Sequence, residues 1–193
     1  MGERSRLEAG EWYLDDDELV ALRRGVARLL HRWNGLGPDE EVERRRILAE
    51  LLAEVGEGVE VVPTFRCTYG SHTRLGDRVF VNAGAFLMDD ATITIGADTR
   101  LGPGAQLMTA LHPIDDHARR REGWERALLI TIGENVWLGA NVVVCPGVTI
   151  GRNTVVGAGS VVLRDLPDHV VAAGSPAAVL RETPREDVGS PPA

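Results

Sequence analysis

An aliphatic residue recurs at every sixth position over much of the C-terminal half of the chain. The register is strictest at Ile132, Leu138, Val144, Ile150, Val156 and Val162, where glycine often follows, as in Gly133, Gly139, Gly151 and Gly157. A period of six fits neither an α-helix nor an alternating β-strand. It fits a triangular solenoid in which each hexapeptide forms one side of a prism and the aliphatic residue points inward. The pattern therefore predicts a mainly β protein built as a repeat solenoid.

The same register begins earlier and is then interrupted. It runs through Leu75, Val81, Leu87 and Ile93, moves by two residues to Ile95, and continues at Leu101 and Leu107. The segment from His112 to Leu129, HPIDDHARRREGWERALL, is polar and rich in Arg, and none of its aliphatic residues falls on the six-residue grid. We expect it to leave the solenoid as an extruded loop. Long loops on rigid scaffolds are often functional, and this one carries two of the five histidines.

Two amphipathic helices are expected ahead of the solenoid. Asp15 to Asp17 can cap the first, and the sequence Gly35 to Pro38 separates it from the second. The two apolar stripes consist of Leu19, Leu22, Val26, Leu29 and Trp33, and of Val42, Leu48, Leu51, Leu52 and Val55. Because a solenoid needs protected ends, we expect this α-helical hairpin to cover the first coils.

These patterns divide the chain into three parts. Residues 1–58 are expected to form the helical cap, and residues 59–167 the β-helix with its extruded loop at 112–129. Residues 168–193 form a C-terminal extension that leaves the register through the turn Gly174-Ser175-Pro176. Its last dozen residues, ETPREDVGSPPA, are expected to be disordered.

Composition narrows the class of protein. The chain of 193 residues has a net charge of −8 and contains no Lys, and its basic residues alternate with acidic ones, which indicates no surface for nucleic acid or an anionic membrane. No signal-like core or apolar stretch of about 20 residues is found, so we expect a cytoplasmic protein without membrane contact. Cys67 and Cys145 fit no zinc-binding spacing and are expected to be free thiols.

Several longer motifs are more specific than the hexapeptide period. They are AGEWY at 9–13, VPTFRCTYG at 62–70, Phe80-Val81-Asn82, Asp89-Asp90, TALHPID at 109–115, NVWLGANVVVCPGVTIG at 135–151 and AAGSPA at 172–177. Through them the chain resembles, over nearly its whole length, the maltose, galactoside and nodulation O-acetyltransferases, the sugar-modifying branch of the hexapeptide acyltransferases. The resemblance implies a left-handed parallel β-helix that transfers acetyl from acetyl-CoA to a hydroxyl of a sugar or related small molecule. It also implies a homotrimer with each active site between two solenoids.

His112 is the candidate catalytic residue. Transfer of an acetyl group from a thioester to an alcohol requires removal of the hydroxyl proton, and imidazole is the common side chain for this task. His112 lies where the regular register ends and the loop begins, inside the TALHPID motif. The alternative is a structural role in which His112 caps a coil before Pro113.

The resemblance also implies the groups that bind acetyl-CoA. It places the donor for the oxyanion at the backbone N–H of Ala140 and places Trp137 at the border of the thioester site; Trp137 can equally be a corner-filling aromatic. The implied cofactor-binding set is Trp137, Gly139, Ala140, Ala158, Arg164 and Arg181. Ala178 replaces an Arg of the family, so the phosphates of CoA are expected to rely on Arg181, unless both arginines are ordinary surface charge.

Acceptor recognition is assigned by the same resemblance. Asn82 and Asp90 match family positions that bind substrate hydroxyls, and Asp15 and Arg23 match across a one-residue gap. For Asp89-Asp90 the alternative is a solvated turn between coils, and for Asn82 it is an Asn ladder inside the β-helix.

Three alternative functions remain open at this point. The acceptor can be an antibiotic rather than a sugar. A β-helical, zinc-dependent carbonic anhydrase would hold zinc with His72, His112 and His117 from adjacent chains, although their spacing does not fit a common level of the solenoid. A non-enzymatic trimeric scaffold would need only the coils. Because no Cys near the HPID or VWLG elements lies at a position that the family uses as a nucleophile, we expect direct transfer in a ternary complex. No metal is expected to be required.

Overall fold

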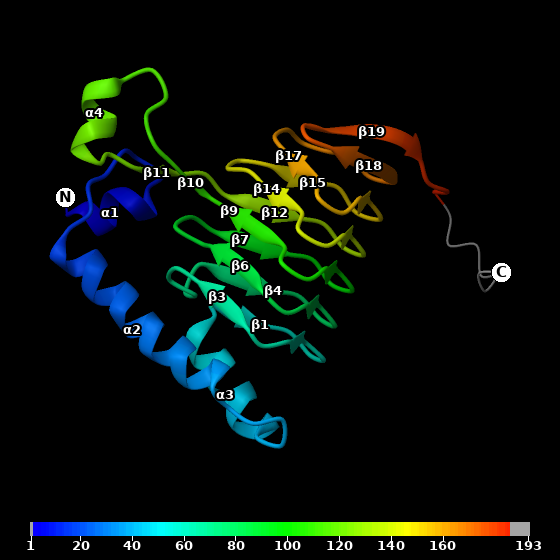
Figure 1. The fold of residues 1–193 in the computed structure, drawn as a ribbon, viewed down its shortest axis with the longest axis horizontal. Coiled ribbons are helices and arrows are strands. Elements are labelled where there is room, and N and C mark those ends of the chain that lie inside the picture. Colours follow the sequence, from blue (N-terminus) through cyan, green and yellow to red (C-terminus); the bar gives the residue numbers. More distant parts are fainter. Residues whose placement is uncertain (1, 186–193) are drawn as a thin grey trace.

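The computed structural model of the protein describes residues 2–185, which form a three-sided parallel β-helix with helices at its N-terminal end (Figure 1). Each coil contributes one short strand to each of three walls, and the walls are parallel sheets because successive coils stack in register. The fold confirms the left-handed parallel β-helix that the sequence predicted. No helix of the described residues is long and apolar enough to cross a bilayer.

The first wall is a parallel sheet in the order β1-β4-β7-β12-β15. In this wall Leu75 pairs with Ile95, Ile95 with Ile132, and Ile132 with Ile150. Its strands are β1 (Glu54–Val55), β4 (Thr73–Leu75), β7 (Ile93–Ile95), β12 (Ile130–Ile132) and β15 (Thr149–Ile150).

The second wall is the longest sheet of the described residues, in the order β19-β18-β16-β13-β8-β5-β2. All of its strands are parallel except β19, which folds back antiparallel to β18. They are β2 (Glu60–Val61), β5 (Phe80–Val81), β8 (Arg100–Leu101), β13 (Trp137–Leu138), β16 (Val155–Val156), β18 (Val170–Gly174) and β19 (Ala177–Glu182).

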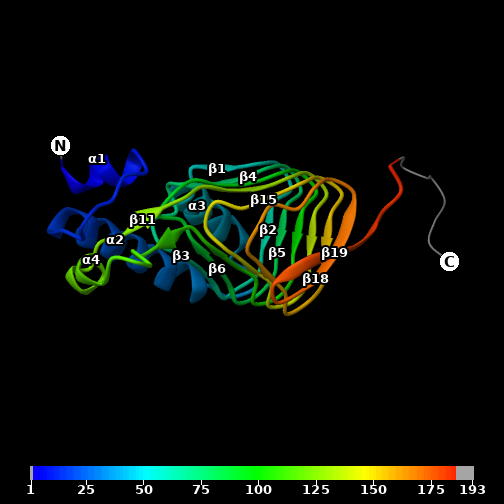
Figure 2. The same cartoon turned by 90° about the horizontal axis from the view of Figure 1, so that it is seen from above.

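The third wall is again fully parallel, in the order β17-β14-β9-β6-β3. Its strands are β3 (Phe65–Cys67), β6 (Ala85–Met88), β9 (Gln106–Met108), β14 (Val143–Val144) and β17 (Val161–Val162). Figure 2 shows the three walls enclosing a narrow interior.

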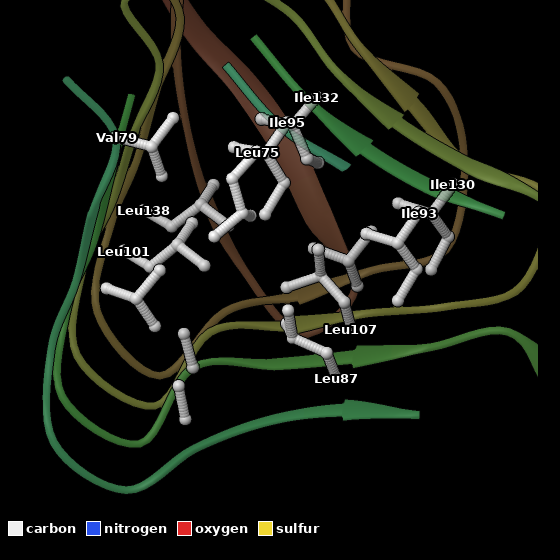
Figure 3. Close-up of a cluster of buried hydrophobic side chains, with 14 of the residues drawn as sticks. Leu75, Val79, Leu87, Ile93, Ile95, Leu101, Leu107, Ile130, Ile132 and Leu138 are labelled. Carbon is white, nitrogen blue, oxygen red and sulfur yellow. The ribbon is translucent and has the colours of Figure 1, made fainter. Parts of the chain in front are cut away.

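The hexapeptide aliphatic residues fill that interior. Figure 3 shows Leu75, Leu87, Ile93, Ile95, Leu101 and Leu107 pointing toward one another from successive coils, and none is more than 1% exposed. At the two-residue shift, Ile93 and Ile95 at the two ends of β7 both point inward, and they pair with Ile130 and Ile132 of β12. Gly139 is required for stacking, since a Cβ there would lie 2.6 Å from the backbone nitrogen of Ala158.

The N-terminal cap consists of α1 (Glu3–Glu8), α2 (Asp17–Asn34) and α3 (Glu41–Leu51). The side chain of Asp16 caps α2 by accepting from the N–H of Leu19 at 2.9 Å. Trp33 is fully buried, and its ring meets Phe65 of β3 edge to face at 6.1 Å. The cap therefore packs on the first coils, as expected.

Some of the expectations for the cap need correction. Helix α1 was not predicted, because its only buried residue is Leu7 and it has no apolar stripe. Val42 is 86% exposed and does not belong to the second stripe; α3 buries Ile47, Leu48 and Leu51 instead.

The solenoid extends beyond the expected residues 59–167 at both ends, since β1 already pairs with β4 and β18 pairs with β16. The division into cap, solenoid and extension remains a proposal. Of the last dozen residues, for which disorder is expected, 186–193 lie outside the described residues, and Glu182 ends β19.

The segment 112–129 leaves the solenoid after β9 of the third wall, and the chain returns to it at β12 of the first wall. It is bounded by the antiparallel pair β10 (Ala110–Leu111) and β11 (Arg126–Ala127), with α4 (His117–Glu122) between them. The side chain of Asp116 caps the start of α4, and Gly123 ends it in the left-handed conformation with φ of 89°. Figures 1 and 2 show this loop beside the N-terminal segment.

Candidate active site

His112 lies directly after β10, at the base of the loop, and its side chain is exposed. Its Nδ1 atom lies 3.0 Å from the carbonyl oxygen of Trp124. A carbonyl oxygen can only accept, so Nδ1 carries the ring hydrogen and donates it. In the neutral ring Nε2 then keeps its lone pair and can accept a proton. The loop thus fixes the tautomer that a general base requires.

A short segment of the N-terminus holds the returning side of the loop. Tyr13 and Glu125 form an isolated antiparallel bridge, with N–H···O distances of 2.9 Å in both directions. The Tyr13 hydroxyl also donates to Oε2 of Glu125 at 2.9 Å. Burial and the charges of Asp90 and Glu125 raise the pKa of Tyr13, so this hydroxyl keeps its hydrogen.

Asp90 is the most unusual carboxyl group of the site. It is only 5% exposed, its Oδ2 atom has no hydrogen-bond partner among the described residues, and Oδ1 lies 3.5 Å from the Tyr13 hydroxyl. Burial raises the pKa of Asp90 to about 6, and the negative charges of Glu125 and Asp89 contribute to this increase. The positive charge of Arg23 acts in the opposite direction and lowers the pKa. A buried oxygen without a partner is costly, so Asp90 is suited to bind a polar ligand group.

The neighbouring Asp89 has a different role. It is fully buried and accepts from the N–H groups of Thr68 and Tyr69 and from the Thr73 hydroxyl. This carboxylate therefore ties two coils together, and the alternative of a solvated turn for Asp89-Asp90 is wrong because both residues are buried.

Asp15 and Arg23 lie near Asp90 on the cap. The Arg23 guanidinium forms an ion pair with Asp15 and donates to the hydroxyl of Tyr69 at 2.8 Å. The charge of Arg23 also acts on the carboxyl of Asp90. Three of the four predicted acceptor-binding residues, Asp15, Arg23 and Asp90, thus lie near one another where the cap meets the solenoid.

An open depression of about 890 Å³ adjoins this cluster and is lined in part by Asp90, His72 and Arg126. The depression gives Asp90 contact with a space large enough for a small polar molecule.

Asn82 lies elsewhere. It follows β5 on the second wall, and its Oδ1 atom accepts from the N–H of Ala83 at 2.8 Å. This hydrogen bond joins neighbouring residues of one coil, so Asn82 does not form the Asn ladder between coils that was the alternative. The structure of one chain does not bring Asn82 into the cluster around Asp90.

The predicted cofactor-binding residues lie on the second wall. Trp137 is 57% exposed and stands in register between Arg100 and Val155 on neighbouring coils. Gly139 is buried, Ala140 is half-buried and Ala158 is exposed. Among the described residues we find no acceptor for the N–H of Ala140, which leaves that donor available to a ligand.

Arg164 and Arg181 are both exposed, Arg164 after β17 and Arg181 on β19 opposite Val171. Neither forms an ion pair with a described acidic residue, and Arg181 donates only to the backbone oxygen of Glu182, at 3.2 Å. Both guanidinium groups therefore remain available for an anionic ligand.

The second wall and the loop of His112 lie far apart within one chain. In Figures 1 and 2 the loop with α4 and β11 lies on the left, whereas the second-wall strands β5 and β18 lie on the right in Figure 2. Within one chain, His112 is thus separated from the wall that carries Trp137.

The sequence did not single out Tyr13, Tyr69 or Glu125 as site residues. Tyr13 and Tyr69 lie inside motifs that carry the resemblance, which was the available signal. Glu125 lies in the Arg-rich loop, where no pattern indicated that its side chain would turn inward to Tyr13.

The described residues contain no group of three or more His, Cys, Asp or Glu side chains that could hold a metal ion. The three histidines of the zinc alternative are therefore not gathered within one chain. Both cysteines are free, and burial raises the pKa of Cys67, which disfavours its nucleophilic thiolate.

Comparisons with known proteins identify the family. Residues 130–164 match the family description "Bacterial transferase hexapeptide (six repeats)", and residues 6–56 match "Maltose acetyltransferase hexapeptide capping motif". The chain is 39% identical over 178 residues to the galactoside O-acetyltransferase of Escherichia coli, with 92% of this chain and 87% of that protein covered. The chain belongs to the maltose and galactoside O-acetyltransferase family.

Solved structures of the family agree with the fold. A maltose O-acetyltransferase from Clostridium difficile 630 superposes with a TM-score of 0.93 at 37% identity, covering 96% of this chain and 99% of that one. A galactoside acetyltransferase in complex with coenzyme A gives a TM-score of 0.90 at 39% identity, covering 94% and 91%. The predicted family and enzyme class, an acyltransferase, are confirmed, and acetyl-CoA as co-substrate agrees with the ligand of that relative.

Proposed function

We propose that the protein transfers the acetyl group of acetyl-CoA to a hydroxyl of a sugar or related small molecule, with His112 as general base. The observation that carries the proposal is the hydrogen bond of His112 Nδ1 to the Trp124 carbonyl, which leaves Nε2 as the basic atom at the mouth of the loop. Membership of the family supports the reaction class.

The reaction is a direct transfer in a ternary complex. Nε2 of His112 takes the proton of the acceptor hydroxyl while the oxygen attacks the thioester carbonyl carbon. The carbonyl oxygen becomes an oxyanion, to which the N–H of Ala140 donates. When the carbon–sulfur bond breaks, the imidazolium returns the proton to the sulfur, and free CoA leaves. Burial of Cys67 supports a route without an acetyl-enzyme.

The acceptor is held by the cap side of the chain. Asp90 offers an unpartnered carboxyl oxygen, and Asp15 and Arg23 offer a charged pair next to Tyr69. Hydroxyl groups both donate and accept, so a polyhydroxylated molecule matches a set that mixes carboxylates with a guanidinium. Asn82, which lies on the second wall, would contribute from the chain that supplies Ala140.

The assembly is a homotrimer in this proposal, with each site between two chains. One chain supplies His112 and the acceptor pocket, and its neighbour supplies Trp137, Ala140 and the cationic groups Arg164 and Arg181 for CoA. The separation of these two sets within one chain supports this arrangement.

A substrate panel tests the proposal. The native chain is incubated with acetyl-CoA and maltose, methyl galactoside or hydroxyl-bearing antibiotics, and release of the CoA thiol is followed. We expect acceptor-dependent release with a sugar. Release with antibiotics but not with sugars would assign the alternative acceptor class. If none of the hydroxyl compounds causes release of the thiol, O-acetyl transfer is contradicted.

A further inference from the structure

The loop that carries His112 is tied to the N-terminus by one residue pair. Tyr13 and Glu125, which are far apart in sequence, exchange two backbone hydrogen bonds of 2.9 Å. The Tyr13 hydroxyl adds a third at 2.9 Å to Oε2 of Glu125. Arg126 strengthens the contact, because its Nε atom donates to the carbonyl of Gly10 at 2.8 Å. The N-terminal segment is thus bridged to the residue that directly precedes β11.

This pair lies next to the group that orients the imidazole. Trp124, whose carbonyl accepts from His112 Nδ1, directly precedes Glu125. Leu111, which directly precedes His112, pairs with Arg126 on the other side of Glu125. A movement of Glu125 therefore moves both the carbonyl that orients the ring and the strand that carries it.

The Tyr13 hydroxyl depends on Glu125 for its acceptor. Tyr13 is 1% exposed, so its hydroxyl cannot exchange its partner for solvent. The hydroxyl has one hydrogen and donates it at 2.9 Å to Glu125, whereas Asp90 is 3.5 Å away. Loss of the Glu125 carboxylate would leave a buried hydroxyl without a good acceptor and would remove the side-chain part of the contact that fixes the loop on the N-terminal segment.

We propose that Tyr13 and Glu125 are positioning residues that hold His112 in its catalytic tautomer through the Trp124 carbonyl. The proposal rests on the proposed function of His112 as general base. Neither residue touches a reacting atom. Their contribution is to fix the loop, and a misplacement of about 1 Å in a catalytic group can lower a rate by about 100-fold.

Steady-state kinetics with maltose or methyl galactoside as probe acceptor test the effect on turnover. We expect Glu125→Ala and Tyr13→Phe each to lower kcat by about 10- to 100-fold, with KM for acetyl-CoA changed by less than about twofold. Glu125→Gln keeps an oxygen that accepts from Tyr13 and should lose less than about threefold. The matched control is Glu134→Ala, which removes an exposed glutamate from the turn before β13.

A double-mutant cycle separates a shared contact from two independent effects. If the hydroxyl and the carboxylate act through one hydrogen bond, the double variant Tyr13→Phe with Glu125→Ala should be no slower than the slower single variant. Multiplied losses in the double variant would mean that the two residues act separately and would overturn the proposal.

Nuclear magnetic resonance of the imidazole nitrogens gives a readout without any substrate. In the ¹⁵N-labelled native protein the signal assigned to His112, by its loss in His112→Ala, should be that of the Nδ1–H tautomer. Glu125→Ala and Tyr13→Phe should shift the population toward Nε2–H, and Glu125→Gln should not. Should Glu125→Ala fail to fold, the contrast between Tyr13→Phe and Glu125→Gln carries the same test.

The possible results are distinct from a failure of the proposed function. If His112→Ala is inactive but Tyr13→Phe keeps the native kcat and tautomer, the positioning role of Tyr13 and Glu125 is overturned and the proposed role of His112 is not. Equal losses in Glu125→Gln and Glu125→Ala would show that the charge matters rather than the hydrogen bond, and would also overturn it. Normal activity of His112→Ala would instead remove the general base itself.

Discussion

The carbonyl oxygen of Trp124 lies 3.0 Å from Nδ1 of His112, and the two residues face each other across the base of the extruded loop. This contact lies within one chain and needs no ligand. Under the proposed function, the imidazole is therefore oriented before substrates bind, which lowers the reorganisation needed during transfer. The loop that interrupts the hexapeptide register is therefore the element that orients the His112 ring.

Asp90→Asn should stabilise the fold at neutral pH. Burial raises the pKa of Asp90 from its ordinary value of 3.8 to about 6, so the folded state disfavours the ionised form. The free-energy cost of burying the ionised carboxylate is absent below the pKa of Asp90 in the unfolded chain. It grows between about pH 4 and 6 and is complete above the pKa of Asp90 in the folded protein. The substitution should add up to about 3 kcal/mol to the free energy of unfolding at pH 7.5, and under about 1 kcal/mol at pH 4.

Urea unfolding at both pH values and at one fixed protein concentration measures this difference. The control is Asp39→Asn, which makes the same change at an exposed position between α2 and α3 and should shift the free energy of unfolding by no more than about 0.5 kcal/mol. A destabilised Asp90→Asn at pH 7.5 would show that the charge of Asp90 is well compensated in the fold.

Asp90→Ala and Asn82→Ala should impair use of the acceptor far more than use of acetyl-CoA. Asp90 has an unpartnered oxygen beside the open depression, and the amide nitrogen of Asn82 has no hydrogen bond to a described residue. Loss of a group that binds a substrate hydroxyl typically costs about 1 to 3 kcal/mol, or roughly 5- to 150-fold in kcat/KM for the acceptor. Initial rates with each substrate varied in turn give both constants; equal losses for the two substrates would indicate a folding defect.

Mixed oligomers test whether two chains share each site. His112→Ala and a bulky Ala140→Trp are each expected to be inactive. In a mixed trimer some interfaces pair the intact His112 of one chain with the intact Ala140 of the other, so activity should be partly restored. The two variants are co-expressed with different tags, and doubly tagged oligomers are isolated and assayed. Activity no higher than that of either parent, in oligomers shown to be mixed, would contradict a shared site.

The solenoid could be predicted from sequence because its core repeats. Every wall buries one aliphatic residue per hexapeptide, so a local pattern such as Ile132, Leu138 and Val144 reports the packing directly. Helix α1 could not be predicted in this way, since it contributes only Leu7 to a contact with Tyr13, Leu19 and Tyr69.

The site could be predicted only in part, because only some of its residues lie in local motifs. His112 and Asp90 lie in motifs that could be read from the chain, whereas the role of Glu125 depends on a contact with Tyr13 across 112 positions of sequence. Contacts at such separation leave no local periodicity. They appear only when the cap and the loop are placed together.

The most direct test of the account is the turnover of His112→Ala with acetyl-CoA and the best sugar of the panel, measured as release of CoA thiol. Removal of a positioned general base should lower kcat by about 10² to 10⁴, while acetyl-CoA binding and the oligomeric state persist. The control is His31→Ala, which changes an exposed histidine of α2 and should retain native turnover. Near-native kcat in a folded His112→Ala protein that binds acetyl-CoA would contradict the central claim.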